Sequence, residues 1–92
     1  MPINIYQENS DRNQIDWICD DDWELPSQVF ELENWLIKNK ANLKAGPYIA
    51  DIGFTVRKDA SGGGGILSLK MIEILHKIKM EIFLSEYIDD ED

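Results

Sequence analysis

The sequence predicts a single small α+β domain, with two helices packed on one face of a small mixed sheet, in the order β-β-α-β-α-β. Three observations predict this fold. Several segments alternate apolar and polar residues, two others repeat apolar residues at helical spacing, and the chain has 92 residues, 43% of them hydrophobic. That length supports one core. We expect the domain to span residues 1–88 and to be followed by an acidic tail, residues 89–92.

The first predicted strand covers residues 2–7, where Ile3 and Ile5 fall on one side of an extended chain. Residues 8–13 follow with Asn, Ser and Asp, whose side chains bond to the nearby backbone and favour turns. We therefore expect the chain to reverse direction here.

Residues 14–25 alternate apolar and acidic side chains. An extended chain would direct Trp17 and Trp23 inward and four carboxylates outward, so both indoles are expected in the core. The alternative is that Trp23 is partly exposed and anchors an interface. The three aspartates Asp20–Asp22 oppose pairing with a further strand, which favours a loop or an edge strand.

The first helix is predicted over residues 27–44, with Ser27 as its N-cap and Gly46 followed by Pro47 as its stop signal. Lysines gather towards its C-terminal end, where cations favour the helix dipole. Its apolar stripe consists of Val29, Leu32, Leu36 and Leu43, widened by Phe30 and Ile37.

Residues 48–58 predict a strand with apolar residues on one face. Gly53 inside it indicates a bulge or a close approach of another part of the chain. Residues 59–65 include four successive glycines and predict a flexible connection.

A second helix is predicted over residues 69–79, capped by Ser68, and a last strand over residues 80–87. The strand–helix–strand segment is long enough to join two parallel strands. The apolar stripe of this helix consists of Met71, Ile74, Leu75 and Ile78.

The charged residues are segregated along the chain, which has a net charge of -9. Residues 1–33 have a net charge of -8, residues 34–80 a net charge of +5, and the last twelve residues hold six acids and no base. Nucleic acid is an improbable ligand for so acidic a chain. Solvation alone favours positive and negative side chains interspersed along the chain. Their segregation therefore favours an acidic surface that steers a basic protein partner.

We expect this surface to combine carboxylates, which would pair with Lys and Arg of the partner, with an apolar contact from Trp23. The expected partner-binding residues are Asp16, Asp20, Asp21, Asp22, Trp23, Glu24, Asp89 and Asp90, extended by Glu91 and Asp92.

Enzyme chemistry is not expected. The run Gly62–Gly65 lacks the Lys-Ser or Lys-Thr pair of a phosphate-binding loop, and His76 is the only histidine, so no cofactor or metal site is predicted. Cys19 precedes three aspartates, which favours a buried, inert thiol. A single cysteine and no visible signal peptide favour the cytoplasm.

Two resemblances accompany these features. The segments ADIGFTVRKD, LSLKMIEILHKIKM and EIFLSEY, with the glycine loop between the first two, resemble the closing half of a bacterial domain of unknown function. In size, acidity and scarcity of cysteine, the chain resembles the immunity proteins of contact-dependent inhibition and polymorphic toxin systems. The second resemblance implies a protein that neutralises a toxin, often a basic nuclease.

Our leading hypothesis is therefore an immunity-type inhibitor of a basic toxin. The alternative is a phage-encoded acidic mimic of nucleic acid that blocks a host defence or transcription complex. A small-molecule or sensory module that uses the glycine loop is a third possibility. Self-association also stays open, because the basic middle of one copy could meet the acidic ends of another.

Overall fold

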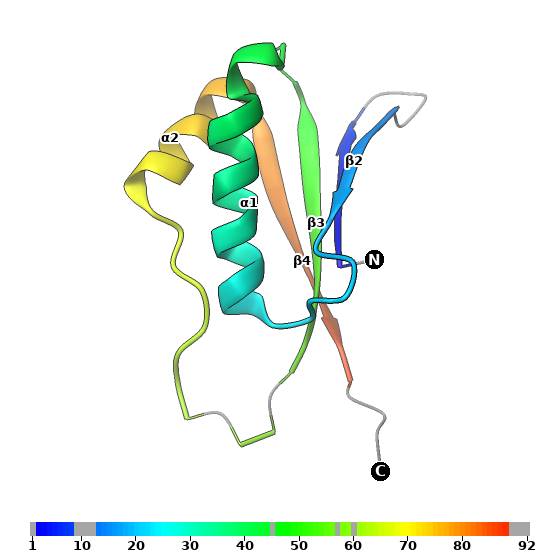
Figure 1. The fold of residues 1–92 in the computed structure, drawn as a ribbon, viewed down its shortest axis with the longest axis vertical. Coiled ribbons are helices and arrows are strands. Elements are labelled where there is room, and N and C mark those ends of the chain that lie inside the picture. Colours follow the sequence, from blue (N-terminus) through cyan, green and yellow to red (C-terminus); the bar gives the residue numbers. More distant parts are fainter. Residues whose placement is uncertain (1, 9–12, 45, 57, 60, 89–92) are drawn as a thin grey trace.

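The computed structural model describes residues 2–8, 13–44, 46–56, 58–59 and 61–88. It confirms the predicted element order and a single α+β domain, in which both helices lie on the same side of a four-stranded mixed sheet (Figure 1). The elements are β1 (Ile3–Gln7), β2 (Asn13–Ile18), α1 (Leu25–Asn39), a short 3-10 helix η1 (Lys40–Asn42), β3 (Tyr48–Thr55), α2 (Leu69–Ile78) and β4 (Met80–Tyr87).

The sheet has the strand order β2-β1-β3-β4, so β2 and β4 form its two edges. β1 runs antiparallel to both β2 and β3, with Ile3 opposite Ile18 on one side and Ile52 on the other. β3 and β4 are parallel and are joined through α2, as a strand–helix–strand crossover requires.

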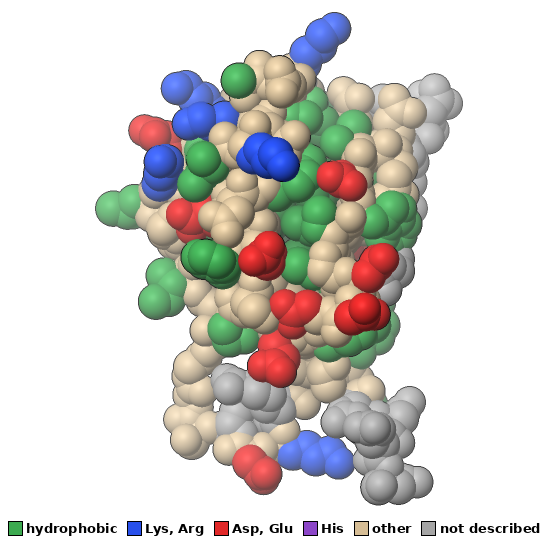
Figure 2. Space-filling view, viewed as in Figure 1, with side chains coloured by type: hydrophobic (Ala, Val, Ile, Leu, Met, Phe, Trp, Pro, Cys, Tyr) green, Lys and Arg blue, Asp and Glu red, His purple; other side chains and the backbone are tan. Residues whose placement is uncertain are grey.

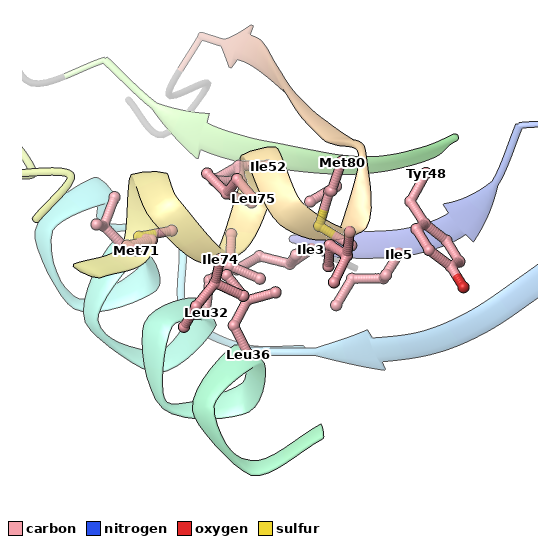
Figure 3. Packing of buried hydrophobic residues seen from close by; sticks show 13 residues of the cluster. Ile3, Ile5, Leu32, Leu36, Tyr48, Ile52, Met71, Ile74, Leu75 and Met80 are labelled. Carbon is pink, nitrogen blue, oxygen red and sulfur yellow. The ribbon is translucent and has the colours of Figure 1, made fainter. Parts of the chain in front are cut away.

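The core lies between the sheet and the two helices (Figure 3). Ile3 and Ile5 of β1 are fully buried, as predicted, and the predicted stripe of α2 is buried too. Side chains from the strands and helices point towards one another in Figure 3. The buried cluster comprises Ile3, Ile5, Val29, Leu32, Leu36, Tyr48, Ala50, Ile52, Met71, Ile74, Leu75, Ile78 and Met80.

The predicted bounds of the first helix were wrong at both ends. α1 begins at Leu25 with Glu24 in the N-cap position, and Ser27 lies inside its first turn. At the other end, the Asn39 side chain donates a hydrogen bond to the backbone oxygen of Trp35 (2.8 Å), and the chain then tightens into η1. A polar side chain that bonds to the last turn in this way competes with continuation of the helix.

The second helix is confirmed as predicted at its start. The Ser68 hydroxyl accepts a hydrogen bond from the backbone nitrogen of Met71 (3.0 Å) and donates one to the Glu33 carboxylate (3.0 Å), so it also connects α2 to α1. Lys79, with a φ of 63°, ends the helix in a left-handed conformation, and β4 follows at once.

The expected alternation of residues 14–25 was wrong. β2 ends at Ile18, and within it Asp16 lies opposite the inward-facing Ile5, whereas Trp17 lies opposite Asn4 on the uncovered face of the sheet and is 41% exposed. Because strand residues alternate between faces, Asp16 points to the helix side, where the Trp35 indole nitrogen donates to it (2.8 Å). The core therefore does not contain Trp17.

The face of the sheet opposite the helices presents aromatic side chains. Phe83 follows the half-buried, core-packed Ile82 and thus points away from the helices, where it is 54% exposed. Trp23 and Tyr87 lie over Gly53 on the same face. None of the helices in the described ranges is both long and apolar enough to cross a membrane.

Candidate protein-binding surface

The loop between β2 and α1, residues 19–24, carries most of the predicted acidic site and is held in one shape by its own hydrogen bonds. Cys19 adopts a left-handed backbone conformation (φ 58°), and the backbone nitrogen of Asp22 donates to the Cys19 oxygen (3.1 Å). The Asp22 carboxylate accepts from the Glu24 backbone nitrogen (3.0 Å) and from the Ser27 hydroxyl (2.5 Å). The loop is thus preorganised at the start of α1.

Gln28 fastens this loop to the sheet. Its side chain is fully buried, and its amide nitrogen donates to the backbone oxygens of Asp22 and Gly53, both at 2.6 Å. The Gln28 Oε1 atom has no hydrogen-bond partner within the described part of the chain, so the residue is held there through its donors. The backbone nitrogen of Thr55 also donates to the Trp23 oxygen (2.9 Å), which places residue 23 beside β3.

A groove of about 540 Å³ lies between this loop, the end of β2 and the outer face of α1. The Trp35 indole forms one wall and is fixed by its hydrogen bond to Asp16. The groove is also lined by the carboxylates of Asp22 and Glu31 and by Lys38 of α1. The lining residues are Ile18, Cys19, Asp22, Ser27, Glu31, Asn34, Trp35 and Lys38.

The groove has a negative electrostatic environment, and this environment changes the pKa of the Cys19 thiol. Burial together with the charges of Asp22 and Glu31 raises the pKa of the Cys19 thiol from 9.0 to about 11. The thiol is therefore protonated at neutral pH and a poor nucleophile, although Cys19 is half-buried and not fully buried as expected.

The charge segregation seen along the chain persists in three dimensions. Figure 2 shows Lys side chains mostly over the upper part of the molecule, where α1 ends, and Asp and Glu side chains over the lower half of α1 and the neighbouring loop. Within the described ranges, no carboxylate forms an ion pair with a lysine. The acidic surface is therefore not neutralised by the chain itself.

The predicted site residues of the loop fall into two groups. The carboxylates of Asp20, Asp21 and Glu24 are exposed and have no hydrogen-bond partner within the described part of the chain. The carboxylates of Asp16 and Asp22 are engaged in the bonds given above and shape the surface. No three metal-ligating side chains come together among the residues that the structure describes.

Trp23 is separated from the groove. Its ring packs edge-on against Tyr87, with 5.5 Å between ring centroids and an angle of 84°, and both lie over Gly53. Trp23 is neither buried in the core nor a wall of the groove, and its remaining exposed surface faces the uncovered side of the sheet. The remaining predicted residues, Asp89, Asp90, Glu91 and Asp92, lie outside the described residues.

Two residues of the surface were missed by the sequence analysis. Glu31 and Trp35 are four positions apart and therefore lie on one face of α1. This face of α1 was not part of the expected partner-binding surface. The signal that could have found it is an indole in register with a carboxylate on the polar side of an amphipathic helix.

Comparison of the chain with models of protein families, with curated proteins and with solved structures found no match.

Proposed function

We propose that the protein is an immunity-type inhibitor, which binds and neutralises a cognate basic toxin, in the simplest case a nuclease domain, through an acidic surface. We define this acidic surface as residues 19–24 together with the groove beside α1. The observation that carries the proposal is a hydrogen-bonded loop whose free carboxylates form no ion pair with a cation in the described part of the chain.

The chemistry of the surface fits a cationic ligand. A Lys or Arg side chain of the partner would enter the groove between Asp22 and Glu31, and an Arg guanidinium could also stack on the Trp35 indole. Asp20 and Asp21 stand free at the rim, where they would steer the approach of a basic protein. A nuclease presents such cations because it must bind phosphate.

Preorganisation supports an inhibitory role. The bonds from Asp22 and Gln28 fix the loop before any partner arrives, so binding does not have to order it. Ordering loops and side chains on association reduces affinity, and a toxin inhibitor needs tight and rapid binding.

The first test is capture of the partner from a lysate of the native strain with tagged protein, at low and at high salt. We expect one basic protein, retained at low salt and weakened at high salt. Addition of the purified chain should then inhibit the nucleic-acid cleavage activity of the captured protein. A large host assembly in place of a single basic protein would support the nucleic-acid mimic instead.

The surface itself is tested by charge reversal. The double variant Asp20→Lys and Asp21→Lys should slow association with the captured partner by about tenfold or more, because it inverts the steering charge. The matched control reverses two exposed acids elsewhere, Asp59→Lys and Glu73→Lys, which gives the same net charge. Equal association rates for the two variants would refute the proposed surface.

A further inference from the structure

We propose that the outer edge of β4 is a self-association surface, on which a second copy of this chain pairs antiparallel and extends the sheet to eight strands. β4 is an edge strand of eight residues. It pairs with β3 in one unbroken register, without a bulge. Its sequence contains no Pro or Lys, two residues that often protect edges from pairing, and its two charged residues, Glu81 and Glu86, lie towards its ends.

The backbone of β4 presents free hydrogen-bonding groups on its outer side. The oxygens of Lys79 and Tyr87 point to β3, because they accept from Tyr48 (2.9 Å) and Val56 (3.2 Å). Backbone groups alternate in direction along a strand, so those of the even-numbered residues face outward. No hydrogen bond joins this outer side to another segment that the structure describes. The outward residues are Met80, Ile82, Leu84 and Glu86.

The side chains favour one symmetric register, centred on Phe83. Two copies related by a twofold axis place Phe83 beside its own counterpart on the uncovered face of the sheet. On the helix side, Ile82 of each copy lies opposite Leu84 of the other, and Met80 lies opposite Glu86. On the uncovered face, Glu81 lies opposite Ser85. Apolar residues thus meet apolar residues at the centre of the interface, Glu86 meets Met80 only at its two ends, and no two carboxylates face each other.

This register also accounts for Leu84, which points to the helix side yet is 53% exposed. A second copy would cover it with Ile82. The neighbouring symmetric register, centred on Leu84, would instead place Phe83 opposite Ser85 and move Glu86 opposite Ile82, nearer the centre of the interface. Apolar complementarity therefore selects Phe83 as the centre.

Charge complementarity favours the same arrangement. The Phe83-centred register brings the end of one β4, with the exposed Glu86, beside the start of the other β4, which Lys77 and Lys79 precede. In sequence, Ile88 and four acids come after the end of β4. Glu86 of each copy thus lies near the basic turn of the other. The dimer does not depend on the proposed toxin partner, because the groove lies at the opposite edge of the sheet.

The association is tested by measuring molar mass over a concentration series with light scattering after gel filtration and with sedimentation equilibrium. We expect the mass to rise to twice that of the chain. Leu84→Lys should raise the dimer dissociation constant by about tenfold or more, since it places a charge in the interface twice. The matched control is Leu69→Lys in the first turn of α2, where the side chain is 85% exposed, and it should leave the dimer unchanged.

The register is tested by disulfide formation in a Cys19→Ala background. Phe83→Cys should give a cross-linked dimer under mild oxidation, whereas Ser85→Cys should not, because Ser85 faces Glu81 of the other copy. Far-ultraviolet circular dichroism verifies that every variant is folded. A monomer at all concentrations, or a dimer that Leu84→Lys leaves intact, would overturn the edge pairing, and cross-linking through Ser85→Cys alone would overturn the register.

Discussion

The two edges of the sheet are built in different ways. β2 has six residues, its pairing with β1 shifts register between Ile5 and Tyr6, and its side chains bond to neighbouring polar groups. Gln14 donates to Asn4 (2.7 Å), and Asp16 accepts from Trp35 (2.8 Å). β4 has eight residues in continuous register, with apolar side chains on both of its faces.

The difference shows how one small sheet can serve two kinds of contact. The β2 edge is irregular and acidic, which protects it against strand addition and suits it to a charged partner. The β4 edge has regular backbone and apolar side chains, which suit it to another strand. On the proposals made above, each edge selects its partner by a different force, and substitutions should affect binding at the two edges independently.

The largest expected effect is at Gln28, which holds the acidic loop on the β2 side. Gln28→Ala should lower the free energy of unfolding by about 2–3 kcal/mol, because the buried oxygens of Asp22 and Gly53 lose their donor. Urea denaturation measures the change. Asn34→Ala, an exposed amide on the same helix, is the control and should cost less than about 0.5 kcal/mol. Equal costs would mean that Gln28 does not fasten the loop.

A smaller loss of stability is expected at Gly53, where Trp23 of the loop after β2 contacts Tyr87 of β4. A Cβ atom at Gly53 would lie 2.9 Å from the Tyr87 ring and 3.6 Å from the Trp23 ring. Gly53→Ala should therefore cost about 1–2 kcal/mol by displacing the aromatic pair, and it should change tryptophan fluorescence.

A double-mutant cycle identifies the cause of the Gly53 effect. In a Tyr87→Ala background, Gly53→Ala should be less costly than in the native chain, because the ring that its methyl group meets is absent. Strict additivity of the two substitutions would show that the aromatic contact is not the source of the cost.

The smallest expected effect is the pH dependence that the Cys19 thiol adds to stability. It leaves the free energy of unfolding at neutral pH unchanged. The thiol pKa of about 11 predicts slow alkylation near pH 8 and a rise in the alkylation rate as the pH approaches 11. The unfolded thiol ionises first, so stability should fall as the pH rises from about 9 to about 11. A cysteine at an exposed position outside both surfaces, Ile66→Cys in a Cys19→Ala background, should titrate near the usual 9.0, and identical profiles would contradict the effect of burial, Asp22 and Glu31 on Cys19.

Much of the fold could be predicted because local rules and tertiary packing agree. Ser68 caps α2 and the glycine-rich connection precedes it, so the position of this helix follows from short-range chemistry. The buried stripe of α2 and the parallel pairing of β3 and β4 follow from periodicity and chain length. The aromatic contacts of Gly53 explain why the strand interior has a glycine there.

The β2 region could not be predicted, because its conformation depends on distant residues. Alternation placed Trp17 inside and Asp16 outside, but an edge strand has room for a carboxylate on its helix side when an indole N–H, here from Trp35, reaches it. The end of α1 was misplaced because Asn39 bonds to the helix backbone before the Gly46-Pro47 stop signal is reached. Both errors arise from single polar contacts that periodicity cannot show.

The position of β1 has a consequence for how the protein is made. β1 leaves the ribosome before the other strands of this sheet, yet it lies inside the sheet, and its second neighbour, β3, begins about forty residues later. At a synthesis rate of roughly 5–20 residues per second, the β1–β2 hairpin waits a few seconds for β3. During that interval only α1 is available to cover Ile3 and Ile5, because β3 and α2 are made later, so the hairpin would expose part of its apolar side to chaperones before the sheet can close.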